Sequence, residues 1–353
     1  MRFALTDEQQ EFRDAVRSLL ADTCAPDDVR AAWADATLAG GGPGGGDGRV
    51  RRAWSALGEM GVLGLCVPED HGGLGGTDED LVPLLIEVGR AGLPDPVSST
   101  AGVVVAALRD HAAPGVAATW LPRVAAGEVA IGVGFEGAGT VPAAASLDAF
   151  LLSDRDELHL VERTGVELEP LETVDGARHL ARVRWTPSEA TLLAGGTDDL
   201  REGFGPVNET FDRAALGAAA MLVGLSRRML DMAIQYAGER QQFGVPIGSF
   251  QAIKHQLADA SLAVEFAEPL VLRAANSLAL GDPGAPAHVS MAKAAISDAA
   301  DGAARASLQV HGAIGYTVEY DLHLYMKRAW ALAVRHGDAA FHRKRVRTAV
   351  LGV

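Results

Sequence analysis

The sequence predicts a mainly α-helical protein with an N-terminal helical domain, a middle β-barrel-like domain and a C-terminal four-helix bundle. Apolar residues recur at helical spacing at the start of the chain and over four long segments of its second half. Short β-rich runs bounded by turn-forming residues lie between these two helical parts. Long Ala- and Leu-rich helices with short connections are typical of an up-down bundle. We expect the domains to span residues 1–125, 126–205 and 206–353.

The N-terminal domain is expected to consist of helices joined by glycine-rich connections. The first helix begins after Thr6, where Gln9 completes a capping pattern ahead of apolar residues at helical spacing. The glycine-rich segment 40–48 predicts a loop, and apolar periodicity resumes over 54–63 and 80–92. Glycines and a proline between those two helices predict a turn.

The middle and C-terminal domains differ in the length of their apolar segments. Three short runs in the middle domain predict strands at 149–152, 158–161 and 180–185. Four long segments in the C-terminal domain predict helices at 212–240, 249–280, 287–314 and 322–336. Each of these helices is long enough to cross a domain.

Composition and charge exclude several classes of function. A net charge of -15 argues against nonspecific nucleic-acid binding. The longest apolar segment, 214–225, is shorter than the ~20 residues that a membrane-spanning helix needs, and the N-terminus lacks the pattern of a secretion signal. Cys24 and Cys66 have no metal-like spacing, so we expect reduced thiols in a cytoplasmic protein that uses neither membrane nor metal.

Basic residues concentrate near the C-terminus of this acidic chain. Such a patch could bind a phosphorylated small ligand, or its members could complement helix dipoles and face water. The residues concerned are Lys327, Arg328, Arg335, His342, Arg343, Lys344, Arg345 and Arg347.

The segment that joins the first two bundle helices carries the clearest sign of a ligand. Arg240, Phe243 and Gln251 surround a Gly/Pro turn at a helix end. An Arg, an aromatic ring and an amide can bind a pyrophosphate, stack on a flat heterocycle and hydrogen-bond it. The alternative is that Arg240 pairs with a nearby acid, Phe243 lies in the core and Gln251 faces water.

Three motifs make the chain resemble the acyl-CoA dehydrogenase family over nearly its whole length. The segment 240–251 is similar to the family's R-x-x-F-G…Q signature, and 309–316 is similar to its Q-x-x-G-G-x-G-[YF] signature. In the N-terminal part, the segment 68–73 is similar to the family's P-E-x-x-G-G turn. The order helices, small β domain and four-helix bundle agrees with this resemblance.

The resemblance implies a flavin adenine dinucleotide (FAD) enzyme that oxidises the Cα–Cβ bond of an acyl-CoA thioester. In the family a Glu removes the α-proton while hydride passes to the flavin, and electron-transfer flavoprotein is the expected acceptor. By position, Arg240 would contact the pyrophosphate, Phe243 would pack on the adenine side and Gln251 would hydrogen-bond the cofactor. Backbone and amide groups of a second segment would hold the same FAD, across a dimer interface: Gln309, Val310, His311, Gly312 and Ala313.

The family's catalytic Glu has no counterpart in this sequence. The two positions at which the family places it fall on Ala214 and His336. Alanine cannot accept a proton, whereas an imidazole can do so near pH 7. Asp212 and Asp338 lie two residues from these positions, a shift that turns a helical side chain by about 200°. Apart from catalysis, Asp212 could start a helix, His336 could face a helix dipole and Asp338 could be a cap.

The middle domain also departs from the family. The family's T-E-P-x-x-G-S-D segment, which contacts the flavin ring and the thioester, corresponds here to 134–142, where only an acid, glycines and a displaced Thr-Pro are similar. We therefore expect the flavin-ring half of the site to be degraded on this chain.

Three functions agree with these matches and departures. The first is the non-catalytic chain of a heteromeric α2β2 acyl-CoA dehydrogenase, which completes the FAD site of a homologous partner that carries the Glu. Such enzymes act on bulky acyl-CoAs, including steroid side chains, by analogy within the fold. The second is a self-sufficient homo-oligomeric enzyme that uses His336 or a displaced Asp as base. The third is a flavin-free subunit that only stabilises its partner.

Overall fold

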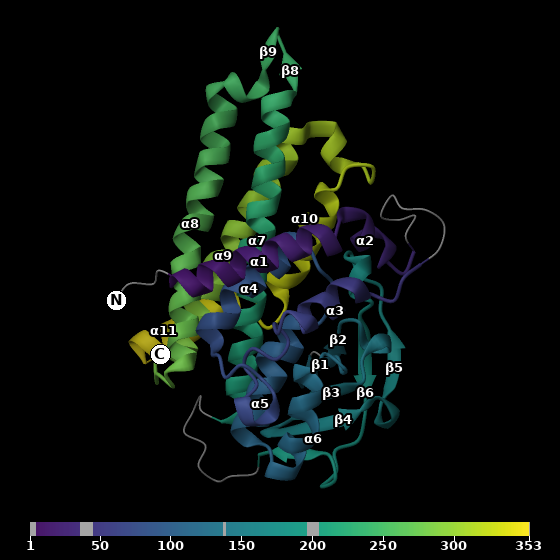
Figure 1. Cartoon of the computed structure of the whole chain (residues 1–353). Helices are drawn as coiled ribbons and strands as arrows, with labels where there is room; N and C mark the ends of the chain where they lie inside the picture. The colour runs from purple at the N-terminus through teal and green to yellow at the C-terminus, as the bar shows by residue number, and fades with distance from the viewer. Residues whose placement is uncertain (1–4, 36–44, 137–138, 196–204, 353) are drawn as a thin grey trace.

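The computed structural model describes residues 5–35, 45–136, 139–195 and 205–352. Helical segments precede and follow a small β region in the chain, and this region lies at one side of the molecule (Figure 1), so the predicted fold class is confirmed. Residues 40–44 of the loop expected over 40–48, and residues 137–138 of the degraded segment, lie outside these ranges. In the described parts of the chain, no helix is both long enough and apolar enough to cross a membrane.

The N-terminal part is helical, as predicted. The capping pattern at the first helix is confirmed, because Gln9 N donates to Thr6 Oγ1 at 3.2 Å and Thr6 N donates to Gln9 Oε1 at 3.0 Å. The helices are α1 (Asp7–Thr23), α2 (Pro26–Ala31), α3 (Arg51–Glu59), α4 (Asp78–Ala91), the π-helix η3 (Ser98–Val104), α5 (Val105–His111) and α6 (Pro114–Ala125).

The described residues of the β region form two small sheets. One has the strand order β1-β3-β4-β7, with β1 and β3 parallel and the other pairs antiparallel, and the second has the antiparallel order β2-β6-β5. The strands are β1 (Ile131–Gly134), β2 (Thr140–Val141), β3 (Ala149–Asp154), β4 (Glu157–Glu162), β5 (Glu167–Pro170), β6 (Ala181–Arg184) and β7 (Leu192–Ala194). Strands β3, β4 and β6 occupy the three predicted segments.

Within the described residues 205–352, the C-terminal part contains the four predicted helices and one helix that was not predicted. These are α7 (Pro206–Glu239), α8 (Gln251–Ala279), α9 (Ala285–His311), α10 (Leu322–Val334) and the additional α11 (Ala339–Leu351). Helix α9 packs against α7, α8, α10 and α11. Between α7 and α8 the chain forms a two-stranded hairpin, β8 (Gln241–Gln242) and β9 (Val245–Pro246).

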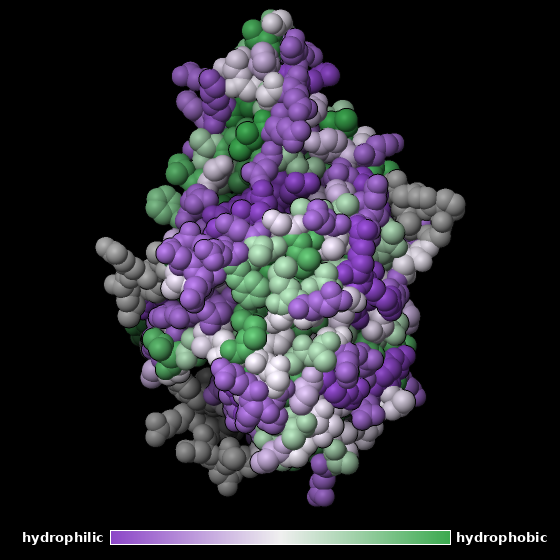
Figure 2. Space-filling model, in the orientation of Figure 1, coloured by the Kyte–Doolittle hydropathy of each residue, from purple (hydrophilic) through white to green (hydrophobic). Residues whose placement is uncertain are grey.

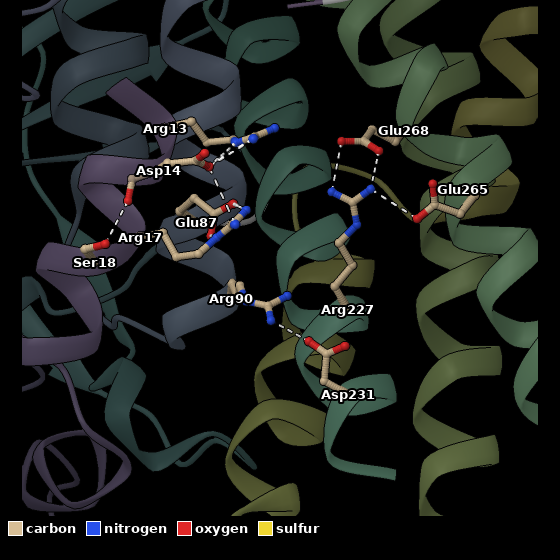
Figure 3. Close-up of polar contacts among 10 residues, drawn as sticks. All are labelled: Arg13, Asp14, Arg17, Ser18, Glu87, Arg90, Arg227, Asp231, Glu265 and Glu268. Carbon is tan, nitrogen blue, oxygen red and sulfur yellow. Dashed lines mark hydrogen bonds and ion pairs between the residues drawn. The ribbon is translucent and has the colours of Figure 1, made fainter. Parts of the chain in front are cut away.

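Close backbone contact and ion pairs join α4 to α7. A Cβ atom on Gly224 would lie 1.8 Å from the carbonyl oxygen of Ile86, so only glycine allows this approach. Figure 3 shows the ion pairs along the same helices. They link α1 to α4 (Arg17–Glu87), α4 to α7 (Arg90–Asp231) and α7 to α8 (Arg227 with Glu265 and Glu268). The N-terminal helices are thus fixed against the bundle.

Candidate functional site

The hairpin between α7 and α8 projects from the body of the molecule and carries the first predicted cluster. It lies at the far end of α7 and α8 (Figure 1), and its tip has apolar surface (Figure 2). Phe243 is 93% exposed and adopts a left-handed backbone with φ of 52°, and its ring meets that of Phe250 edge-on at 6.2 Å. Arg240 and Gln251 are exposed as well, and neither makes a side-chain hydrogen bond or ion pair with a described residue. The alternative of a paired Arg240 and a core Phe243 is wrong.

The second predicted cluster lies at the end of α9 and in the short helix η8 (Gly312–Tyr316). Gln309 and Ala313 are exposed, and Gly312 has φ of 62°, which favours glycine. The side chains of Val310 and His311 are buried, so only their backbones can face a ligand.

Ring contacts bring the two clusters to the same end of the bundle. The imidazole of His311 stacks on Tyr236 with centroids 4.6 Å apart and contacts Tyr320 at 4.7 Å. Tyr236 lies one turn before Arg240 and accepts a 2.8 Å hydrogen bond from its backbone N–H. His311 Nδ1 is 2.7 Å from the carbonyl oxygen of Ser307, and burial lowers the pKa of His311. The sequence analysis did not identify Tyr236. Its position one helical turn before Arg240 is the signal that could have indicated it.

Both expected base positions line a single cavity elsewhere in the molecule. Ala214 on α7 and His336 after α10 face it, together with residues of β1 and the segment before η3. Its volume is about 90 Å³, whereas pockets for drug-sized ligands occupy ~300–1,000 Å³. Neither Ala214 nor His336 supplies a carboxylate to this cavity.

His336 is enclosed by aromatic rings and lacks a group to orient it. Its ring meets Phe135 at 5.5 Å and Phe211 at 6.2 Å, both edge-on, and its nitrogens make no hydrogen bond with a described residue. Burial, and then the charges of Arg335 and Lys293, hold the pKa of His336 well below its ordinary value. A base of such low pKa that is not held by a partner is poorly suited to remove an α-proton.

The two displaced aspartates have structural partners. Asp212 is buried and accepts hydrogen bonds from Arg345 at 2.6 and 3.2 Å, and burial raises its pKa. Asp338 caps α11, because its Oδ1 accepts a 2.8 Å hydrogen bond from the N–H of Phe341. Neither carboxylate lines the cavity.

The basic side chains of the C-terminal segment contact separate partners. Arg328 pairs with Asp175 and Arg343 with Asp298, while His342 is buried. The segment therefore does not form one free anion-binding patch.

The hairpin and the cavity are far apart on one chain. Ala214 and Arg240 are separated by 26 residues of the continuous helix α7, which corresponds to about 39 Å at ~1.5 Å per residue. This distance exceeds the length of an extended dinucleotide. The hairpin cluster and a flavin pocket can meet at one cofactor only if they belong to different chains.

The residues of the hairpin fit part of an FAD molecule. A free guanidinium, an exposed aromatic ring and exposed amides match the chemistry of a pyrophosphate and a flat heterocycle. The cavity beside Ala214 is too small for an isoalloxazine ring in this structure. The chain fits the outer part of the cofactor, and FAD would supply the hydride-accepting chemistry when bound.

Comparisons with known proteins decide the family. Residues 6–128 match the model of the acyl-CoA dehydrogenase N-terminal domain, and residues 201–351 match that of the C-terminal domain. The chain is 33% identical to acyl-CoA dehydrogenase IpdE2 of Mycobacterium tuberculosis over 94% of its own length and 92% of the relative's. The chain belongs to the acyl-CoA dehydrogenase family. The resemblance noted in the sequence is thereby confirmed.

A second acyl-CoA dehydrogenase and one solved structure are also similar to this chain. FadE34 of M. tuberculosis is 33% identical over 96% of this chain, which spans only 46% of that protein's length. The structure of the ChsE4-ChsE5 complex from M. tuberculosis has a chain that superposes with a TM-score of 0.85 at 22% identity, covering all of both chains. At that identity the likeness shows the fold.

Proposed function

We propose that this chain is the non-catalytic subunit of a heteromeric acyl-CoA dehydrogenase. It completes the FAD site of a homologous partner that carries the catalytic Glu, in an α2β2 assembly in the cytoplasm. The substrate is an acyl-CoA thioester with a bulky acyl group, and electron-transfer flavoprotein receives the electrons from the reduced flavin. The proposed division of the chain into 1–125, 126–205 and 206–353 places the FAD-completing residues in the last domain.

The observation that carries the proposal is the cavity between the two base positions. Both Ala214 and His336 line this cavity. Among the described residues, no unpaired carboxylate lies there that could replace the missing Glu. The one carboxylate that lines the cavity, Asp95, is bound by Arg49 and by the N–H of Val50 at 2.7 Å. A chain with this cavity lacks a base for proton abstraction, whereas its exposed hairpin keeps the groups that bind a cofactor.

The relatives support a partner of the same kind. ChsE4 and ChsE5 form a complex, and FadE34 is about twice as long as the segment that this chain matches. A second unit of similar size therefore accompanies related chains, either as a separate subunit or as part of one polypeptide.

The self-sufficient alternative requires His336 to act as the base. The low pKa of His336 and the absence of an orienting hydrogen bond argue against this role. The flavin-free alternative requires the exposed Arg240 and Gln251 to have no ligand. An exposed Phe243 fits contact with FAD or with a partner chain, so FAD binding by an Arg240→Ala variant of the complex distinguishes the two functions.

Turnover of the co-expressed complex tests the proposal. The co-expressed partner is a candidate acyl-CoA dehydrogenase that carries the catalytic Glu, and the assay follows acyl-CoA-dependent reduction of an artificial electron acceptor. Changing the partner's catalytic Glu to Gln should lower kcat by ~10²–10⁴-fold, the range for loss of a general base. His336→Gln in this chain should leave kcat within about twofold. The reverse pattern would establish the self-sufficient enzyme instead.

A further inference from the structure

Three arginines line the cavity that Ala214 and His336 also line. Arg178 lies on the short helix η6 (Gly176–Arg178), Arg328 on α10 and Arg335 directly after α10. Sequence reasoning did not associate Arg178 with this site, because it lies in the β region, far from the other two in the chain. The remaining wall is largely apolar and includes Pro94, Val103, Val133, Pro142, Met221 and Leu332.

Two of the three arginines have partners. Arg328 forms a buried ion pair with Asp175, with one contact at 3.3 Å. Arg335 donates to the backbone carbonyl oxygens of Val133 at 3.1 Å and Thr140 at 3.5 Å. Carbonyl groups satisfy hydrogen bonds but leave the charge of Arg335 uncompensated.

Arg178 has no such partner. The residue is only 8% exposed, and its guanidinium makes no hydrogen bond or ion pair with any residue that the structure describes. The charge of Asp175 acts on it, but that carboxylate is hydrogen-bonded to Arg328. Burial lowers the pKa of Arg178 to about 10, and the group remains charged at neutral pH.

The cavity therefore has an excess of positive charge. Of the residues that line it, Arg178, Arg328 and Arg335 carry three positive charges and Asp95 carries one negative charge. The partners behind the wall, Arg49 of Asp95 and Asp175 of Arg328, cancel each other, so an excess of two positive charges remains. A buried charge without a counter-charge is strongly unfavourable, unless an anion occupies the space beside it.

We propose that this cavity binds a small carboxylate, held by Arg178 and Arg335. The planar guanidinium donates two parallel hydrogen bonds to a carboxylate, and the apolar wall accommodates a short hydrocarbon body better than it accommodates a fully polar inorganic anion. The volume of about 90 Å³ equals about three water molecules, which is the size of a two- to three-carbon acid. On this chain the cavity beside Ala214 and His336 thus serves as an anion site. This inference does not depend on the proposed function.

Ligand-dependent thermal stability of the full chain, alone and in its complex, tests the proposal. Sodium propionate is added and compared with sodium chloride at the same ionic strength. A carboxylate that binds only the folded state raises Tm in a saturable manner. Arg178→Met should weaken this response at least tenfold. The matched control is Arg182→Met, which removes an exposed guanidinium of β6 and should retain the response.

The two variants also separate binding from a structural role. Because Arg178→Met removes an uncompensated buried charge, its Tm without propionate should equal or exceed that of the unmodified chain. An unmodified chain that responds equally to propionate and chloride would overturn the proposal, as would an Arg178→Met variant that keeps its response. A larger response to phosphate than to propionate would overturn the carboxylate assignment.

Free acids and acyl thioesters that end in a carboxylate share this chemistry. Malonate, a three-carbon acid, compared with malonyl-CoA separates the two sources. A larger Tm rise with malonate supports a free acid, and a larger rise with malonyl-CoA supports the end of an acyl chain. No Arg178-dependent response to either would count against the site.

Discussion

Replacing Arg240 with alanine tests the role of the hairpin in cofactor binding. Arg240 is exposed, and its side chain pairs with no described residue, so its removal leaves no buried group without a partner. The free energy of unfolding should change by less than ~0.5 kcal/mol. A hydrogen bond to a charged group contributes ~1.5–3 kcal/mol, so loss of a contact with the pyrophosphate should weaken FAD binding about 10- to 150-fold.

The assay is a titration of the flavin-free complex with FAD, followed by quenching of flavin fluorescence. The matched control is Arg184→Ala, which removes another exposed guanidinium, from β6. The control should bind FAD as the unmodified complex does. Equal FAD affinity for Arg240→Ala and the unmodified complex would refute the reasoning and favour the flavin-free subunit.

Three further predictions concern the folded chain itself. Burial lowers the pKa of His342 to about 4, so protonation of the unfolded chain should reduce the free energy of unfolding by about 3 kcal/mol as pH falls from 6.5 to 4, and urea titrations of His342→Asn should show a shallower fall. Burial raises the pKa of Cys24 to about 12 and that of Cys66 further, so a thiol reagent should label neither until urea unfolds the chain. Gly224→Ala places a methyl group against a carbonyl oxygen of α4 and should lower the free energy of unfolding by about 3 kcal/mol, seen as a lower urea midpoint.

The long helices could be predicted from the helical spacing of apolar residues in the sequence. The residues at which these helices begin and end could be predicted less well. Helix α7 was expected from residue 212 but begins at Pro206, where a proline in the first turn after Gly205 is the signal that was available. Helix α11 was not predicted because its sequence is basic and only His342 is buried on it, so apolar periodicity is weak. The capping Asp338 is the remaining local signal of its start.

The exposed half of the candidate site could also be found from the sequence. Arg240, Phe243 and Gln251 are close in the chain, and a short turn keeps them close in space. The cavity could not be found in this way, because α7, α10 and the β region bring Ala214, His336 and Arg178 together only by tertiary packing. The lack of a counter-charge at Arg178 is likewise a property of burial and has no local sequence signal.

The flavin content and native mass of the purified protein test the central claim most directly. The chain is expressed alone and then with its Glu-bearing partner, and each product is measured by visible absorbance and native mass spectrometry. The account predicts a colourless product from the chain alone and a yellow α2β2 assembly with about one FAD per pair of subunits after co-expression. A stable homo-oligomer of this chain alone with one FAD per subunit would contradict it.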